Sequence, residues 1–166
     1  MAKFTVKGID EYTAALERLS DKAEESIKET VYEGAGIIAD SVKAALYSIP
    51  IDEGTNGLPK YGTPENKLKG VSRKQRADLI ESMGLSPIKE SSTGIDTKIG
   101  WDGYGSVKTK AHPQGVPNVL LMRSIESGTS FMQKTPVIRK AVSKARKTAE
   151  QAMINKMTEK IEEAMK

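Results

Sequence analysis

Few side chains in this sequence have the types and spacing that catalysis requires. One candidate is Asp96-Thr97-Lys98, which faintly resembles the acid-x-lysine element of metal-dependent nucleases. With Asp78 or Glu81 as a second carboxylate, it could hold Mg²⁺ and polarise a phosphate. The same stretch alternates apolar and polar residues, as any half-solvated strand does. The motif therefore indicates a strand at least as well as it indicates a nuclease.

Other common catalytic patterns are missing from the sequence. There is no Cys, which excludes disulfides, thiol catalysis and cysteine-ligated metal centres. The one histidine, His112, precedes Pro113 in a turn-rich region that offers no nucleophile beside it. Neither a G-x-x-x-x-G-K-S/T phosphate loop nor a G-x-G-x-x-G motif after a strand is present. We therefore expect a protein that is not an enzyme and that needs no cofactor or metal.

Two long helices are predicted from the spacing of apolar residues. From Tyr12 to Leu46 these residues recur at steps of three or four, with a break expected near Ser20-Asp21 and an end before Pro50. A second helical pattern follows Pro136 and runs nearly to the C-terminus. Its apolar face consists of Ile138, Val142, Ala145, Ala149, Met153, Met157, Ile161 and Ala164.

Shorter elements complete the expected fold. They are a strand over 3–7, a helix over 76–83, strands over 85–90 and 95–101 that form a hairpin, and a helix over 119–127. Asn118 is the expected N-cap of the last helix, and Gly128 its end. Because strands and helices do not alternate regularly, we expect one α+β domain over 1–166. Its long N-terminal and C-terminal helices would pack on a small, mostly antiparallel sheet.

Glycine and proline mark further features. The segment 50–75 contains several of both and is predicted to be a long loop, of a length that is usually functional or mobile. A second loop is expected over 102–117. Within the first long helix, Gly34 and Gly36 each weaken the helix by roughly 1 kcal/mol relative to Ala. We expect them to allow close approach of another element.

Charge is distributed unevenly along the chain, whose net charge is +4. Residues 1–47 carry six basic and nine acidic side chains, net −3, whereas residues 60–76 carry six basic and one acidic, net +5. Residues 134–166 carry nine basic and four acidic side chains, also net +5. Opposite charges suit contacts between copies of the chain, and the basic parts could also contact DNA phosphates. No apolar run approaches the roughly 18 residues of a membrane span, so no membrane contact is expected.

Two segments carry a resemblance to a known family. The first is Pro50-Ile51-Asp52-Glu53-Gly54, and the second is Glu126-Ser127-Gly128-Thr129 followed by Pro136 and Arg139. With Leu79-Ile80-Glu81-Ser82-Met83 between them, the chain resembles the neck or tail-completion proteins of long-tailed, non-contractile bacteriophages over nearly its whole length. It departs from that pattern at Val137, where the family usually has an aromatic residue, and in a longer loop over 55–75.

The resemblance implies a structural subunit of the phage head–tail junction. Such a subunit forms a ring of copies, six-fold or twelve-fold, and contacts other neck, connector or tail proteins. Genomic DNA passes through the ring without sequence-specific contact, and the protein is part of the virion after assembly in the host cytoplasm. The motif and interface candidates are Pro50, Asp52, Gly54, Glu126, Gly128, Thr129, Pro136 and Arg139.

The motif residues themselves have structural roles that can be stated in advance. Gly128 lets the chain reverse, Thr129 or Ser130 caps the turn, Pro136 begins the last helix, and Glu126 satisfies backbone amides of the turn. Partner contacts are expected in loops 50–75 and 102–117 and in the turn at 126–136. Two alternatives stay open: a basic protein that binds double-stranded DNA, and the metal-dependent nuclease.

Overall fold

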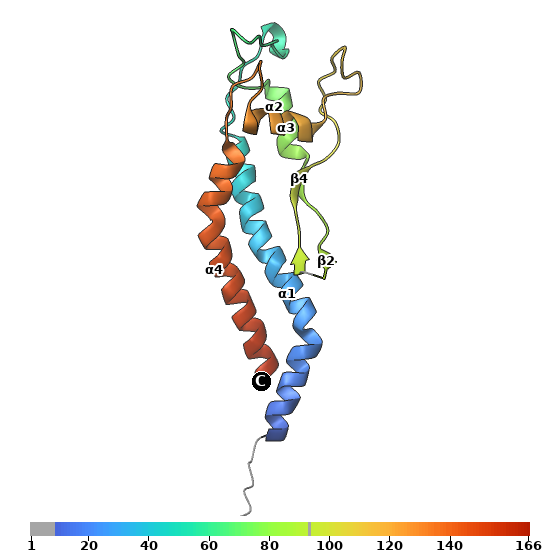
Figure 1. Ribbon diagram of the computed structural model, residues 1–166, viewed down its shortest axis with the longest axis vertical. Helices are drawn as coiled ribbons and strands as arrows, with labels where there is room; N and C mark the ends of the chain where they lie inside the picture. The colour runs from blue at the N-terminus through green and yellow to red at the C-terminus, as the bar shows by residue number, and fades with distance from the viewer. Residues whose placement is uncertain (1–8, 93) are drawn as a thin grey trace, which may run out of the picture.

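The computed structural model describes residues 9–92 and 94–166 (Figure 1). Two long helices, α1 (Ile9–Leu46) and α4 (Val137–Met165), run antiparallel along the length of the molecule. The fold is α+β, as expected, because a β-hairpin flanks α1 on the side away from α4. The predicted strand over 3–7 lies outside the described residues.

α1 is continuous over 38 residues, so the predicted break near Ser20-Asp21 is wrong. No proline or glycine stands near that point, and Leu16, Leu19 and Ala23 keep the helical spacing across it. A serine can cap a helix but does not end one whose apolar face continues. At 1.5 Å per residue α1 is about 57 Å long. Because α4 has 29 residues, the first turns of α1 extend beyond its end (Figure 1).

Small side chains form the contact between α1 and α4. Ala141, Ala145 and Ala149 are buried at steps of four along α4. A Cβ added to Gly34 would lie 2.5 Å from the Met153 sulfur, so the expected close approach is confirmed at this glycine. A Cβ on Gly36 would meet nothing within 4 Å. Of the predicted apolar face of α4, Ile161 is exposed instead of buried.

The predicted hairpin is confirmed, but each of its strands is interrupted. β1 (Met83–Leu85) pairs with β4 (Ile99–Trp101), and β2 (Lys89–Ser91) pairs with β3 (Gly94–Asp96), both antiparallel. Pro87 lacks an N–H for the ladder. Between the two ladders, the Ser86 amide donates to the Lys98 carbonyl at 2.7 Å, and the Ser86 carbonyl accepts from the Thr97 hydroxyl at 2.7 Å.

Two short helices begin at places other than those predicted. α2 (Arg73–Glu81) starts three residues earlier, because Ser72 and Gln75 form a capping box. α3 (Asn118–Ser127) follows Pro117, so Asn118 is the first helical residue and not the N-cap. Its side-chain amide donates instead to the Asp102 carbonyl at 2.9 Å. A single 3₁₀ turn, η1 (Thr55–Gly57), lies in the long loop.

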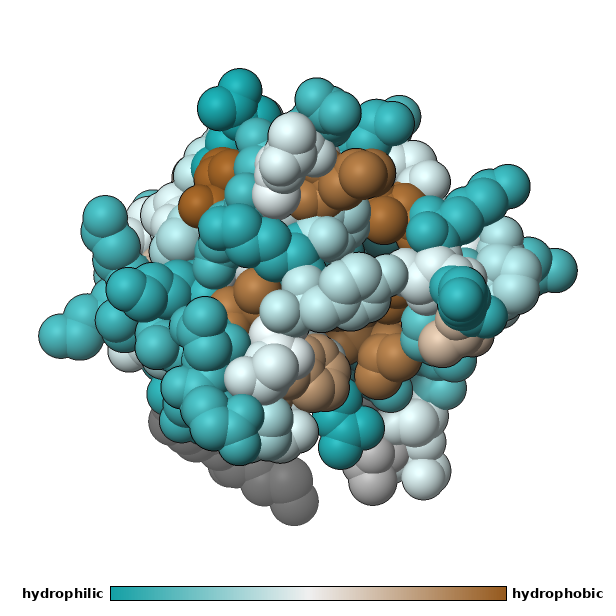
Figure 2. Space-filling view, turned by 90° about the horizontal axis from the view of Figure 1, so that it is seen from above, coloured by the Kyte–Doolittle hydropathy of each residue, from teal (hydrophilic) through white to brown (hydrophobic). Residues whose placement is uncertain are grey.

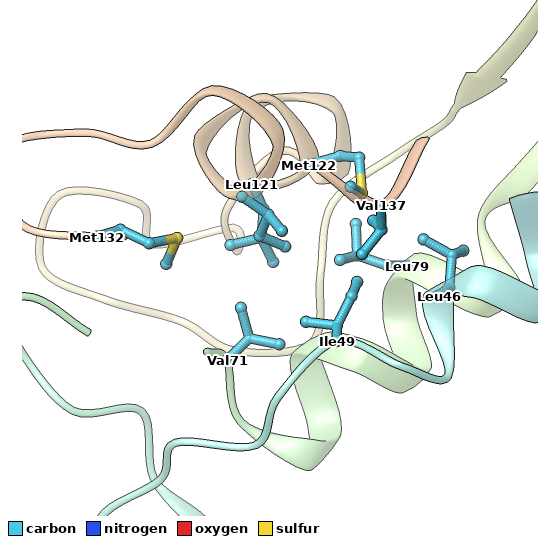
Figure 3. Packing of buried hydrophobic residues seen from close by; sticks show 9 residues of the cluster. Leu46, Ile49, Val71, Leu79, Leu121, Met122, Met132 and Val137 are labelled. Atoms are coloured by element: carbon cyan, nitrogen blue, oxygen red, sulfur yellow. The ribbon is translucent and has the colours of Figure 1, made fainter. Parts of the chain in front are cut away.

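The main hydrophobic core lies at one end of the molecule, where the helices meet the loops (Figure 3). Its buried members come from the end of α1 and the residues after it, loop 50–75, α2, α3, the turn after α3 and the start of α4. They are Leu46, Ile49, Val71, Leu79, Leu121, Met122, Ile125, Met132 and Val137. We call this part, residues 50–82 and 102–136, the loop end. It is held together by large side chains, whereas the α1–α4 pair below it is held by small ones.

Candidate assembly interface

Loop 50–75 and the turn after α3, which contain the two motif segments, are joined at the loop end. The Leu68 amide donates to the Phe131 carbonyl at 2.9 Å, and the Gln133 amide donates to the Leu68 carbonyl at 2.8 Å. A Cβ on Gly62 would lie 2.0 Å from the Phe131 oxygen, so only glycine permits this approach. Loop 50–75 and the turn after α3 therefore form one layer, although about 60 residues separate them.

Pro50 lies at the base of this layer. Its carbonyl accepts a hydrogen bond from the Val71 amide at 3.0 Å, and the Asp52 amide donates to the Val71 carbonyl at 3.0 Å. A Cβ on Gly70 would lie 1.9 Å from the Pro50 oxygen. The two ends of the long loop are thereby closed on each other.

Asp52 binds two other residues of the same loop. One carboxylate oxygen accepts from Lys60 Nζ at 2.8 Å and the other from the Lys69 amide at 3.0 Å. Both hydrogen bonds lower the pKa of Asp52 below its usual range. The bond from Lys60 has the larger effect and the bond from the Lys69 amide the smaller one. The Gly54 amide donates to the Leu58 carbonyl at 2.7 Å, closing the turn that follows. Asp52 and Gly54 both hold backbone in place.

Glu126 has a different partner from the one predicted. The turn after α3 was expected to supply the amides, but the carboxylate accepts from the Ile138 amide at 2.9 Å and the Arg139 amide at 3.1 Å. These belong to the first turn of α4, whose preceding residue, Pro136, makes no side-chain cap. Glu126 thus caps a helix that starts after the turn, and it lies only 8% exposed. Arg139 Nε lies 3.6 Å from the same carboxylate.

The other motif residues are placed as predicted. Gly128 ends α3 with φ 75°, a conformation that favours glycine. The Thr129 hydroxyl accepts from the Phe131 amide at 3.3 Å, which caps the turn. Pro136 directly precedes Val137, the first residue of α4. The turn and both of its flanking helices are fixed by these contacts.

The residues proposed for a nuclease are not brought into one site. Asp78 accepts from the amide and the hydroxyl of Ser106 at 2.8 and 3.0 Å. Asp96 pairs across the hairpin with Lys89, in the ladder farther from α2. Within residues 9–92 and 94–166 no three His, Cys, Asp or Glu side chains are grouped so that they could hold a metal ion.

An apolar cleft of about 350 Å³ opens at the loop end. Loop 50–75, loop 102–117, α3 and the turn after it all contribute to its lining, and His112 lies on its wall. Three apolar side chains at the cleft are largely exposed: Tyr61 at 88%, Phe131 at 45% and Leu120 at 44%. Figure 2 shows apolar residues between polar ones on this face. Sequence reasoning missed the cleft, because its lining is scattered over some 80 residues.

Several cations of the two basic stretches are already paired. Lys60 bonds Asp52 at 2.8 Å, Arg73 Nε lies 3.2 Å from Glu53, and Arg139 faces Glu126. These pairs reduce the positive charge that the loop end could offer to DNA. Other cations of the same stretches, Lys67 and Lys74 among them, make no ion pair with a described residue, so the DNA-binding alternative stays open.

Comparisons with protein-family models, with curated proteins and with solved structures found no match. Among the helices in the described part of the chain, none is both long enough and apolar enough to cross a membrane.

Proposed function

We propose that the protein is a non-enzymatic structural subunit of a phage head–tail junction, a neck or tail-completion ring that joins the tail to the head connector. The observation that carries the proposal is the layer made by loop 50–75 and the turn after α3. The two segments that resemble the phage family meet in this layer, and their polar side chains, above all those of Asp52 and Glu126, are used to hold backbone. Such a site is suited to presenting a rigid surface and not to a reaction.

The cleft beside this layer supports a role in assembly. Tyr61, Leu120 and Phe131 expose apolar surface that the monomer does not bury, and aromatic residues are enriched at the centres of protein interfaces. We propose that the loop end contacts another neck, connector or tail protein of the virion. Copies of the chain would be arranged around the channel, with six-fold or twelve-fold symmetry, so that DNA passes without sequence-specific contact.

The test is genetic and is made in the phage that the proposal implies. Removing the gene is expected to leave filled heads and separate tails in electron micrographs, and purified virions are expected to contain the protein in ring stoichiometry. Virions that assemble and infect normally without the protein would overturn the proposal.

A point variant tests the loop end itself. Tyr61→Asp places a charge at the cleft without disturbing the core, because this side chain is 88% exposed. It is expected to reduce complementation of the deleted gene at least tenfold. Tyr12→Asp is the matched control, since Tyr12 is also exposed but lies on the part of α1 beyond α4. Equal complementation by both variants would rule out the cleft as the contact.

A further inference from the structure

A second groove, of about 650 Å³, runs along the side of α1. Ile88 of the hairpin lines one side of it, and Lys156 of α4 lines the other. Its floor is a continuous face of α1, made by Glu29, Tyr32, Glu33, Gly36, Ile37 and Asp40. The groove lies on the helix pair, below the loop end, and is separate from the cleft described above.

The groove carries negative charge that the chain does not neutralise. Its two cations are occupied, since Lys28 pairs with Glu24 and Glu90, and Lys156 lies 3.4 Å from Glu159. Glu29 in turn pairs with Lys160 at 2.8 Å. Glu33 and Asp40 are exposed and have no ion pair with any described residue. An occupant of the groove would therefore be cationic.

At Gly36, on the floor of the groove, no contact within the described chain requires a glycine. A Cβ on Gly34 would meet the Met153 side chain, but a Cβ on Gly36 would meet nothing within 4 Å. A glycine inside a helix lowers the stability of that helix by roughly 1 kcal/mol relative to Ala, and no contact within the described chain compensates for this at Gly36. A long side chain from outside could lie against the α1 backbone at this position.

The chain itself carries a matching cationic stripe. Lys140, Lys144 and Lys147 are exposed on α4 and make no ion pair within the described residues. Steps of four and three place them on one face of the helix. Read toward the N-terminus of α1, Asp40, Gly36 and Glu33 follow the same steps of four and three. Each set therefore spans about 10 Å along its helix.

We propose that the lysine stripe of one copy docks in the side groove of the next copy, which is the lateral contact of the ring. This inference rests on the proposed function. In the proposed contact the docked helices are antiparallel, as α1 and α4 are within each chain. Because Gly34 lies against Met153, Asp40 is level with about Lys147 of its own chain, so this register needs the helix pair to be inclined to the ring axis. Lys140 then lies opposite Asp40, Lys144 over Gly36, and Lys147 opposite Glu33.

The contact is heterologous, because the groove and the stripe are different surfaces of the same chain. It therefore repeats from copy to copy and closes where the rotation allows. Tyr32 and Ile37, on either side of Gly36, offer apolar surface to the aliphatic stem of Lys144.

The register is tested by cross-linking, for which the absence of native cysteine removes background. Full-length Asp40→Cys and Lys140→Cys proteins are mixed, oxidised and run on a non-reducing gel, both as concentrated protein and in assembled particles. A cross-linked dimer is expected. Asp40→Cys with Lys147→Cys is the matched control, displaced by about 10 Å, and is expected to remain uncross-linked. No cross-link in either setting, or equal cross-linking by both pairs, overturns the proposal.

Charge reversal gives an independent readout. Lys140→Glu with Lys147→Glu is expected to weaken self-association about tenfold or more in sedimentation velocity, and adding Glu33→Lys with Asp40→Lys is expected to restore it. Lys108→Glu with Lys110→Glu makes the same charge change on loop 102–117 and should have little effect.

Three further outcomes are decisive. If the lysine reversal abolishes binding to duplex DNA but leaves self-association unchanged, the stripe is a DNA contact and the docking proposal fails. If virion rings form normally with the reversed lysines, the docking proposal fails while the proposed function stands. A cross-link in register from a protein that virions lack would instead refute the function and keep the contact.

Discussion

Glu126 should contribute to stability through the helix that it caps. The carboxylate accepts the Ile138 and Arg139 amides at 2.9 and 3.1 Å, and Pro136 provides no cap of its own. Losing an N-cap costs about 0.5–2 kcal/mol, and losing a negative charge at a helix N-terminus costs a further 0.3–1 kcal/mol or so. We therefore expect Glu126→Ala to lower the free energy of unfolding by about 1–3 kcal/mol. Glu126→Gln keeps one acceptor and should lose about half as much.

The assay is urea denaturation followed by circular dichroism, with hydrogen exchange as a local readout. In Glu126→Ala the Ile138 and Arg139 amides should exchange about tenfold faster or more, because 1.4 kcal/mol corresponds to a factor of ten. Arg139→Ala is the matched control: its side chain is exposed and lies 3.6 Å from the carboxylate, so it should cost less than about 0.5 kcal/mol. A loss for Glu126→Ala no larger than that for Arg139→Ala would refute the capping role.

Two other predictions concern α1 and the long loop. Gly34→Ala should destabilise the protein, by up to about 2 kcal/mol, because its Cβ would meet the Met153 sulfur, whereas Gly36→Ala should stabilise the monomer by up to about 1 kcal/mol; urea titrations of the two variants check this contrast. Because the folded-state pKa of Asp52 is lowered, its contribution to stability is present above about pH 4–5 and is lost as pH falls through the folded-state value. Asp52→Asn should therefore flatten the acid limb of a plot of unfolding free energy against pH, and an unchanged limb would contradict the role of Lys60 and the Lys69 amide.

The long helices could be predicted because apolar spacing alone determines them. The errors arose where a local preference competed with its surroundings. Ser20 was given a capping role although Leu19 and Ala23 continue the helix, and Ser72 was overlooked because it follows a loop rich in glycine. Pro87, which lacks the N–H of a continuous ladder, falls between β1 and β2, and the hairpin is divided there into two short ladders.

For the candidate interface, the local roles of single residues could be predicted, but the way tertiary packing brings distant residues together could not. Gly128 ends the helix that precedes it, and Thr129 contacts Phe131, two residues away. Their roles therefore follow from the local sequence. Glu126 accepts a hydrogen bond from Ile138, twelve residues away. Ile138 lies in α4, whose position depends on how the turn folds. The cleft requires Tyr61, Leu120 and Phe131 to be brought together by tertiary packing, which no local pattern specifies.

The position of the core has a mechanical consequence. Large buried side chains hold the loop end, while smaller ones, mainly alanines with Gly34, Thr30 and Val42, hold the α1–α4 pair that extends from it. The pair therefore projects from its main anchor at one end, and the hairpin adds the Lys28–Glu90 ion pair partway along α1. Since α1 is about 57 Å long, a tilt of about 5° at the core moves its far end by roughly 5 Å. If copies form the proposed ring, such a tilt would change the opening at the far end by several ångströms while the contacts at the loop end stayed almost unchanged.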